Sequence, residues 1–329
     1  MLKDRFGRRI DYLRLSVTDR CNLRCHYCLP ETYSDFSPAA DMLTDAEILR
    51  LAGCFTSLGV RAIRVTGGEP LTRPGLPALI HGLASLPGVD DLSLSTNGVL
   101  LAPLAQALKD AGLKRVNISL DTLDADRFKT ITRFGDLGKV RQSIDAALAV
   151  GFDPIKLNVV VIRGTNDDEI DAFATLTQTR PIQVRFIELM PMGETGYFSK
   201  ERLLPLDAIM RLAGPLEPLP HDDWPIGHGP ARYHKRPGAK GAIGTISALS
   251  CGFCDTCNRL RLTAKGMLTP CLDGNEGTDL KTPLRQGADD DTLKDLIRHT
   301  VAIKPERHHM VERAQASTPN PRFMCQTGG

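Results

Sequence analysis

The sequence is poor in aromatic residues and has no long apolar run. Aromatic residues make up 5% of its 329 residues, and Trp224 is the only tryptophan. The first residues, MLKDRFGRRIDYLRL, include basic side chains with no apolar stretch behind them. The sequence therefore predicts neither a secretory signal nor a membrane-spanning helix, and we expect a cytoplasmic protein with no membrane partner.

The chain also lacks a strong charge of either sign, internal repeats and low-complexity tracts. Lys and Arg number 41, Asp and Glu number 39, and the formal net charge is +2. Proteins that coat nucleic acid are usually clearly basic, so we expect no nucleic-acid partner, whereas a locally basic pocket for a small polyanion is allowed. With 42% hydrophobic and 24% charged residues, the composition is typical of a soluble globular protein of one large or two medium domains.

The nine cysteines fall mainly into two groups. An odd number in two clusters indicates metal or redox chemistry, not a disulfide framework. The groups are Cys21, Cys25 and Cys28, and Cys251, Cys254, Cys257 and Cys271. Cys54 and Cys325 stand apart, and we expect a small buried hydrophobe and an ordinary tail residue, respectively.

Six short runs rich in β-branched residues alternate with helical patterns between about residue 10 and residue 190. The predicted strands begin at Tyr12, Arg61, Asp91, Arg115, Pro154 and Gln183. Thr44 and Glu47 form a capping box that opens a helix from Asp45 to Thr56, and a second helical pattern runs from Ser143 to Val150. This alternation predicts an α/β fold with a parallel sheet, open or curled toward a barrel, and a site at the carboxyl ends of the strands.

Prolines are dense between Glu201 and Gly241. That density predicts an end to regular structure and a boundary or linker. We therefore expect one domain over residues 1–220 and a second region over residues 221–329. The second region carries the later cysteine group, a helix from about Thr292 to Val301, and a Gly-Gly tail.

The first cysteine group has the spacing C-x3-C-x2-C and directly follows the first predicted strand. Three thiolates on a short loop can hold three irons of a [4Fe–4S] cube and leave the fourth iron open to a small molecule. The alternatives are a structural zinc site with His26 as fourth ligand and an electron-transfer ferredoxin site. His26 is adjacent to Cys25 and is hard to fold onto the same tetrahedron, and a ferredoxin normally closes all four positions.

This spacing resembles the hallmark of the radical S-adenosylmethionine superfamily. TGGEP, from Thr66 to Pro70, supports the resemblance because it ends the second predicted strand. Glycines there let the backbone approach a ligand, and the Glu69 carboxylate can receive an ammonium group. The resemblance implies an incomplete (β/α)6 TIM-type barrel, with S-adenosylmethionine bound at the open iron and cleaved to a 5′-deoxyadenosyl radical.

Spacing alone leaves the second cysteine group open between one four-ligand metal site and a second three-cysteine cube. The string FCDTCNRLRLTAKGMLTPCL is similar to the C-terminal signature of the GTP 3′,8-cyclases, a family that starts molybdenum cofactor (molybdopterin) biosynthesis. That resemblance implies a second [4Fe–4S] cluster in a C-terminal extension, held by Cys254, Cys257 and Cys271, with Cys251 outside the pattern. Further strings match the same family in order: LRLSVTDRCNLRCHYC, RVTGGEP, STNG, NISLD, KLNVVV and FIELMPMG.

Several cations lie in predicted strands among apolar neighbours, where an unpaired charge is costly. They are Arg14, Arg64, Lys156 and Arg185, and Arg259 and Arg261 would point the same way in an extended segment. A triphosphate would neutralise such a ring, whereas surface salt bridges at strand ends are the alternative for any single residue.

The resemblance assigns roles to individual residues. GTP contacts are implied for Arg14, Arg64, Ser95, Lys156, Arg185, Arg259 and Arg261. S-adenosylmethionine contacts are implied for Tyr27, Gly68, Ser119 and Met190. The implied reaction removes hydrogen from ribose C3′, joins C3′ to guanine C8 and gives (8S)-3′,8-cyclo-7,8-dihydroguanosine 5′-triphosphate. The expected partners are GTP, a downstream cyclic pyranopterin monophosphate synthase, an electron donor such as flavodoxin or ferredoxin, and a second copy of the chain in a homodimer.

Gly328 and Gly329 end the chain. A terminal di-glycine also occurs in ubiquitin-like modifiers, but in the resembled family this ending reaches into the active site and supports catalysis. A strip without side chains suits a narrow basic cavity. The remaining alternatives are another radical enzyme with one auxiliary cluster, acting on a peptide or other nucleotide, and a zinc protein that binds nucleic acid or partners without catalysis.

Overall fold

The computed structural model describes residues 1–274 and 276–327. Its main feature is a sheet of 12 strands in the order β14-β13-β12-β3-β4-β5-β6-β7-β8-β11-β10-β9. The six central strands are β3 (Tyr12–Ser16), β4 (Ala62–Thr66), β5 (Asp91–Thr96), β6 (Arg115–Ser119), β7 (Ile155–Val161) and β8 (Ile182–Glu188). Each pairs in parallel with the next, so the predicted parallel sheet is confirmed.

The central strands bury both faces, but the two faces differ in chemistry. Outward side chains such as Leu13, Leu15, Ile63 and Val65 are fully buried in one hydrophobic core with the helices. Inward side chains on the same strands are polar, including the cations predicted to meet an anion. The period-two alternation of a strand therefore separates a packed apolar layer from a polar interior.

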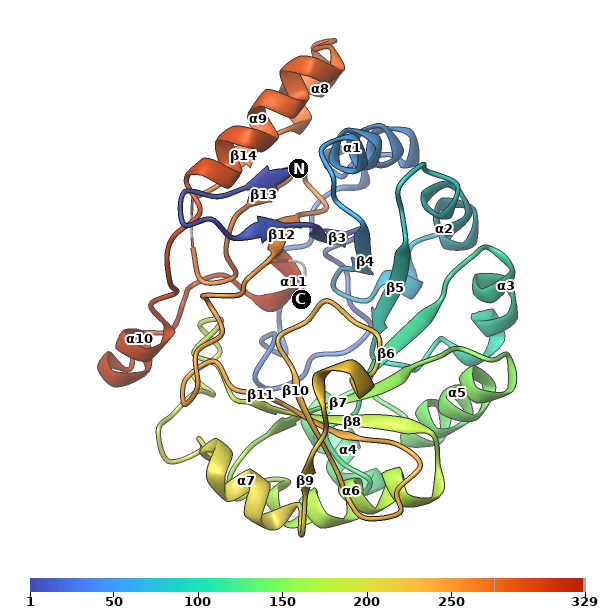
Figure 1. The fold of residues 1–329 in the computed structure, drawn as a ribbon, viewed down its shortest axis with the longest axis vertical. Coiled ribbons are helices and arrows are strands. Elements are labelled where there is room, and N and C mark those ends of the chain that lie inside the picture. The colour runs from blue at the N-terminus through green and yellow to red at the C-terminus, as the bar shows by residue number, and fades with distance from the viewer. Residues whose placement is uncertain (275, 328–329) are drawn as a thin grey trace.

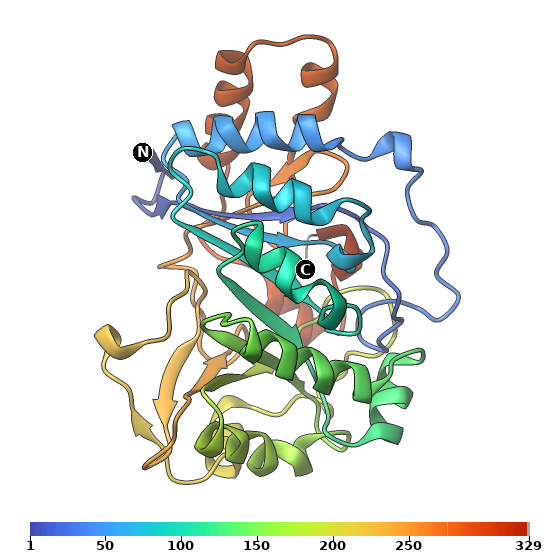
Figure 2. The ribbon, with the colours of Figure 1, turned by 90° about the vertical axis from the view of Figure 1, so that its right-hand side faces the viewer.

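Helices cover the outside of the sheet, and Figure 2 shows several stacked one after another along it. They are α1 (Asp45–Ser57), α2 (Leu76–Ala84), α3 (Ala105–Asp110), α4 (Ala125–Thr132), α5 (Leu137–Ala149), α6 (Ile170–Thr179) and α7 (Leu206–Leu212). Short 3-10 helices are η1 (Ala39–Asp41), η2 (Pro70–Thr72), η3 (Ala102–Leu104), η4 (Asp167–Glu169) and η5 (His221–Asp223). The predicted capping box of α1 is confirmed, because Thr44 Oγ1 accepts from Glu47 N and Thr44 N donates to Glu47 Oε2. Helix α5 begins six residues before the predicted start because Asp136 caps it.

The later part of the chain returns to both edges of the central strands. β11 (Ile243–Ile246) runs parallel to β8, and β12 (Arg259–Leu262) runs parallel to β3. Outer strands β9 (Glu217–Pro218), β10 (Arg232–Lys235), β13 (Met267–Thr269) and β14 (Thr278–Asp279) are antiparallel additions, and β1 (Leu2–Lys3) pairs with β2 (Arg9–Ile10). The last helices are α8 (Lys281–Arg285), α9 (Asp290–Ala302), α10 (Met310–Ala316) and α11 (Met324–Thr327), and α9 confirms the predicted helix near Thr292.

The expectation that prolines end regular structure from Glu201 to Gly241 is wrong in part. Helix α7 and strands β9 and β10 lie inside this segment. Pro205 precedes the first turn of α7, where a proline costs no helical hydrogen bond, and Pro218 lies in the edge strand β9. The prolines therefore occupy positions that tolerate a missing N–H group.

Viewed as in Figure 1, strands β3 to β8 curve around a central space, with helices outside and α11 near the middle. In the sheet order of the described residues, β14 and β9 remain the two ends. The arrangement agrees with the predicted incomplete (β/α)6 barrel with a C-terminal extension. Across the described residues, no helix is long and apolar enough to span a bilayer.

Candidate active site

A cavity of about 290 Å³ lies inside the curved sheet. Most of the residues predicted to bind ligands line it together: Arg14, Cys21, Cys25, Tyr27, Cys28, Arg64, Gly68, Ser95, Ser119, Arg185, Met190, Arg259 and Arg261. Lys156, Cys254, Cys257 and Cys271 are described residues that do not line it. Thus one cavity contacts both the first cysteine loop and most of the predicted cations.

The first cysteine loop packs tightly against the TGGEP segment. Gly68 N donates to Thr18 O at 2.8 Å, and Glu69 N donates to Arg20 O at 2.7 Å. A Cβ added at Gly67 would lie 2.6 Å from Thr18 O, and one at Gly68 would lie 2.3 Å from Arg20 O. The two glycines are therefore required for the close approach of two backbones, which fixes the start of the cysteine loop beside the end of β4.

The three thiols of this loop suit a cationic cluster. Burial raises the pKa of Cys21 to about 11, and burial raises the pKa values of Cys25 and Cys28 well above their usual range. Neighbouring thiols raise the pKa values of Cys25 and Cys28 further, so three bare thiolates would repel one another. Iron supplies the positive charge that makes such thiolates favourable, and the donor set therefore fits a three-cysteine cluster.

The arrangement offers little to the zinc alternative. His26 packs against Tyr197, with ring centroids 5.6 Å apart. Among the residues that the structure describes, no three Cys, His, Asp or Glu side chains are grouped for one metal ion. A cube holds its thiolates farther apart than a single ion does, because each thiolate binds a different iron.

Tyr27 is tied to a buried carboxylate that the sequence analysis did not select. Its hydroxyl donates to Asp121 Oδ2 at 2.6 Å, and Val160 N donates to Asp121 Oδ1 at 2.8 Å. Burial raises the pKa of Asp121 to about 6. The available signal was its position just beyond β6, because charged residues that follow the carboxyl end of a parallel strand often lie at the functional site.

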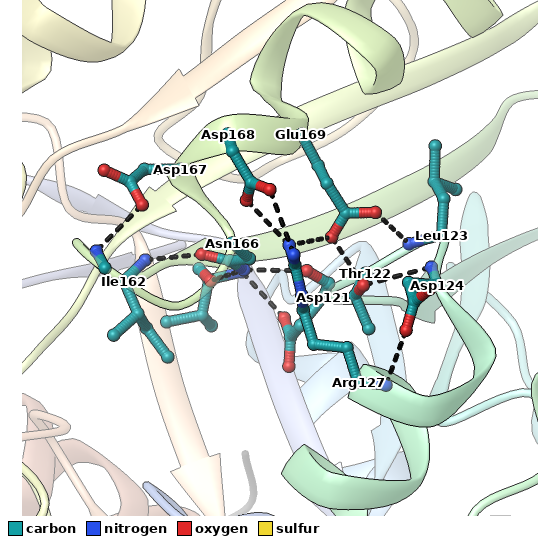
Figure 3. A network of polar contacts seen from close by, with 12 residues as sticks. Asp121, Thr122, Leu123, Asp124, Arg127, Ile162, Asn166, Asp167, Asp168 and Glu169 are labelled. Carbon is teal, nitrogen blue, oxygen red and sulfur yellow. Dashed lines mark hydrogen bonds and ion pairs between the residues drawn. The ribbon is translucent and has the colours of Figure 1, made fainter.

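A polar network holds the loop that carries Asp121 (Figure 3). Asn166 Nδ2 donates to Asp121 O at 2.7 Å, and Thr122 Oγ1 bonds to the Glu169 carboxylate. Arg127 then bridges Asp168 and Glu169, with Nη1 to Oδ1 at 2.6 Å and Nη1 to Oε2 at 2.9 Å. The loops that follow β6 and β7 are therefore fixed to each other beside the cavity.

Glu69 lines the cavity with both carboxylate oxygens engaged. Oε1 accepts from Leu71 N at 3.1 Å and Thr96 Oγ1 at 2.8 Å, while Oε2 accepts from Asn97 N at 2.7 Å. Burial raises the pKa of this carboxyl to about 7 in spite of these bonds. Its orientation is fixed, and a cationic group arriving in the cavity would favour the ionised form.

The buried cations find mainly neutral acceptors. Arg64 Nε donates to Ser93 Oγ at 3.3 Å, and Arg64 Nη2 is buried without a hydrogen-bond partner. Arg185 donates to Asn158 Oδ1 at 2.8 Å and to Asn117 Oδ1 at 2.9 Å. Burial lowers the pKa of Arg64 to about 9 and lowers that of Arg185. These acceptors satisfy N–H groups without neutralising charge, so the interior favours an anionic ligand.

Lys156 and Arg115 lie on neighbouring strands, outside the cavity lining. Lys156 Nζ donates to Ile226 O at 2.6 Å, and burial lowers its pKa to about 5. Arg115, which the sequence analysis did not select, bonds to Asp91 through two nitrogens, with Nε to Oδ1 at 2.8 Å. Its position in a predicted strand was the same signal that singled out Arg14 and Arg64.

The second cysteine group stands beside β12 and β13. Phe253 and Leu272, which adjoin Cys254 and Cys271, line the cavity, whereas Cys251 is exposed. Burial alone would raise the pKa of Cys257, but the nearby charges of Arg259 and Lys304 lower it to about 6. Cys257 therefore has a more electropositive setting than the thiols of the first loop, whereas burial raises the pKa of Cys254.

The C-terminal segment enters the cavity between the two cysteine groups. Asn320 Nδ2 donates to Asp273 O at 2.6 Å, and Asn320 O accepts from Gly193 N at 2.8 Å. Met324 and Cys325 on α11 line the cavity, and Cys325 is buried. The prediction of an ordinary tail residue at Cys325 is wrong, because the tail folds inward. Gly328 and Gly329 lie outside the described residues.

Two family models match consecutive parts of the chain. The Radical SAM superfamily model matches residues 15–177, and the Molybdenum Cofactor Synthesis C model matches residues 182–310. A solved structure of Streptococcus suis SuiB bound to S-adenosylmethionine has the same fold, with a TM-score of 0.61 and 15% identity over 88% of this chain and 68% of that one. Cysteine loop, barrel and family model together define a radical S-adenosylmethionine enzyme, a class that uses a [4Fe–4S] cluster and S-adenosylmethionine.

Full-length relatives identify the branch of that class. A GTP 3′,8-cyclase of Pelotomaculum thermopropionicum is 48% identical over 332 residues, and the alignment covers 100% of both chains. One of Heliobacterium modesticaldum is 48% identical over 99% of both chains, and one of Listeria monocytogenes is 46% identical over 100% of this chain and 99% of its own. The chain belongs to the GTP 3′,8-cyclase family, as its motifs predicted.

Proposed function

We propose that this chain converts GTP to (8S)-3′,8-cyclo-7,8-dihydroguanosine 5′-triphosphate, the first step of molybdenum cofactor biosynthesis. The observation that carries the proposal is the shared cavity, which is lined by the three-cysteine loop and by buried arginines that have neutral acceptors. A radical precursor and a polyanionic nucleotide would therefore meet in one cavity.

S-adenosylmethionine would bind at the end of the cavity that the first cysteine loop lines. Cys21, Cys25 and Cys28 would hold the [4Fe–4S] cluster, which supplies the electron that releases a 5′-deoxyadenosyl radical. Tyr27, Gly68, Ser119 and Met190 line the cavity and would orient the cofactor. Glu69 would receive its ammonium group, because that carboxylate is fixed and gains from a cation nearby.

The nucleotide would lie against the interior strands. Arg14, Arg64, Arg185, Arg259 and Arg261 would bind the phosphates by charge-assisted hydrogen bonds, and Ser95 would contact the nucleotide. Lys156 would also bind the phosphates once its hydrogen bond to Ile226 O is broken. These residues position the sugar and exclude water from it, leaving the bond changes at ribose C3′ and guanine C8 to the radical.

The second trio, Cys254, Cys257 and Cys271, would hold a second [4Fe–4S] cluster at the opposite wall. The low pKa of Cys257 favours thiolate ligation there, and an open iron would hold the guanine base. Gly328 and Gly329, which follow α11 in the chain, would support catalysis. A flavodoxin or ferredoxin would supply electrons, a cyclic pyranopterin monophosphate synthase would take the product, and the working form would be a homodimer.

An anaerobic assay tests the proposal. Holoenzyme is incubated with reductant, S-adenosylmethionine and each of the four ribonucleoside triphosphates, and products are identified by mass spectrometry. We expect about eight irons per chain, 5′-deoxyadenosine, and a cyclised product from GTP alone. Formation of 5′-deoxyadenosine with no nucleotide product would contradict the substrate, and bound zinc in a colourless sample would contradict the enzyme class.

A further inference from the structure

Four arginines occupy one transverse row inside the sheet. Arg261 pairs in register with Arg14, Arg14 with Arg64, Arg64 with Ser93, and Ser93 with Arg115. Residues in register on neighbouring parallel strands point to the same face, so Arg115 faces the same interior as the other members. We call Arg261, Arg14, Arg64 and Arg115 the arginine row.

Arg115 differs from Arg64 in having a carboxylate partner. Asp91, at the head of β5, binds Nε and Nη2 of its guanidinium, and the Arg115 side chain is 1% exposed. Nη1 is buried without a hydrogen-bond partner. It lies 3.8 Å from the position that a Cβ on Gly227 would take, and Lys156 Nζ lies 2.7 Å from that position. The ion pair therefore fixes the guanidinium, while its third nitrogen stays buried and unpaired beside Lys156 and Gly227, outside the cavity lining.

The position of Arg115 along its strand decides which part of a nucleotide it can meet. Ser119 ends β6 beside the cysteine loop, and Arg115 begins it, on the same face. Four steps of a strand span about 13 Å. A ribose held near the carboxyl ends of the strands would direct its phosphates toward the amino ends, and the outermost phosphate would reach deepest.

We propose that Arg115, oriented by Asp91, is a specificity-determining residue that contacts the terminal phosphate and distinguishes a nucleoside triphosphate from a diphosphate or monophosphate. This inference rests on the proposed use of GTP. Two buried nitrogens without partners, Arg64 Nη2 and Arg115 Nη1, lie on one row, and unpaired buried N–H groups gain most from an anion. The fixed Asp91 pair means that little side-chain freedom is lost on binding.

The test measures dissociation constants of GTP, GDP and GMP for anaerobic holoenzyme without S-adenosylmethionine, so that no turnover occurs. Arg115→Lys keeps a positive charge against Asp91 but cannot present the same unpaired N–H group. We expect it to weaken GTP binding roughly tenfold and to leave GMP binding unchanged. The double variant Asp91→Asn/Arg115→Gln, which removes the buried pair as a unit, is expected to show the same loss of discrimination. Arg61→Lys, at an exposed pair with Asp90, is the matched control.

The outcomes separate a specificity role from a structural one. Equal weakening of GTP and GMP in both Arg115 variants would mean that the residue only supports the sheet and would overturn the inference, as would unchanged GTP binding. Iron content and thermal unfolding show whether each variant is folded. If the unaltered enzyme binds no GTP, the proposed function fails; if it binds and cyclises GTP while Arg115→Lys keeps the same GTP-to-GMP preference, only the inference about Arg115 fails.

Discussion

Tyr27 and Asp121 are 94 residues apart in the chain and share a 2.6 Å hydrogen bond at the cavity wall. The tyrosine belongs to the cysteine loop and the aspartate follows β6, so the bond ties the predicted cluster loop to the rigid sheet. The network of Figure 3 then continues this tie to the loop after β7.

Breaking this bond should loosen S-adenosylmethionine binding. Tyr27→Phe and Asp121→Asn are each expected to raise its dissociation constant on the order of fivefold to tenfold, because about 1 kcal/mol of positioning is lost. Equilibrium binding to anaerobic holoenzyme measures the effect. Tyr33→Phe, which loses exposed hydrogen bonds to Asp35 O and from Gln326 Nε2, is the control; an equal loss in that variant would argue against a local role for Asp121.

The ionisation of Glu69 should make cofactor binding depend on pH. Burial raises its pKa to about 7, so in the ligand-free protein its contribution to stability is complete below the ordinary carboxyl pKa and is lost as the pH rises through about 7. A cationic ligand favours the ionised form, and affinity for S-adenosylmethionine should fall about tenfold from about pH 8 to pH 6. Glu69→Gln should bind weakly with a flat profile; a wild-type slope in that variant would assign the titration elsewhere.

Triphosphate binding should be accompanied by proton uptake at Lys156. Burial, together with Arg185 and Arg115, lowers its pKa to about 5, so the amine is neutral at pH 7 beside Ile226 O. A polyanion favours the ammonium form, and binding of GTP should take up about one proton. Calorimetry in buffers of different ionisation enthalpy measures it. Lys156→Met should abolish the uptake, and an unchanged uptake would contradict this assignment.

Lys304 should be needed to retain the second cluster. Its Nζ donates to Arg259 O at 2.8 Å and Pro270 O at 2.5 Å, which joins the first residue of β12 to the residue that follows β13. Lys304→Met leaves both carbonyl groups unpaired and should lower the free energy of unfolding by about 3 kcal/mol. Bound iron should fall from about eight toward four per chain. Lys265→Met, at an exposed turn, should retain full iron content.

Removal of Gly328 and Gly329 should separate cluster assembly from catalysis. The truncated chain keeps both cysteine trios, so its iron content should equal that of the full chain, while GTP cyclisation should be abolished. Turnover at the full-length rate would show that the di-glycine has no catalytic role. Product analysis and iron determination on the same sample give both readouts.

Local pattern was enough to predict the central strands and several of the cations that line the cavity. Period-two alternation placed Arg14 and Arg64 on one face, and two residues of spacing placed Arg259 and Arg261 together on β12. The C-x3-C-x2-C loop follows β3, where a parallel sheet forms its site. Each of these features is set by residues within a few positions of one another, so the sequence displays them directly.

Other features depend on contacts between distant segments. In the sequence, Arg115 looks like the other cations of the predicted strands. Its carboxylate partner, Asp91 on the neighbouring strand β5, is found only in the structure. Cys325 became a cavity residue because Asn320 and Arg322 bond to the Cys271 loop and direct the tail inward. Lys156 does not line the cavity, because its amine donates to a carbonyl group of the proline-rich segment.

The sequence by itself determined the family and the six central strands, and it predicted the ligands of the first cluster, because motif spacing and period-two burial are encoded over short stretches. Only the tertiary structure decided which charges have a compensating partner and which glycines are required because another backbone lies close to them. It also decided that the last helix, α11, lines the cavity between the two cysteine groups. The physical reason is that burial and hydrogen-bond partnership are properties of pairs that meet only when the sheet curves around its polar interior.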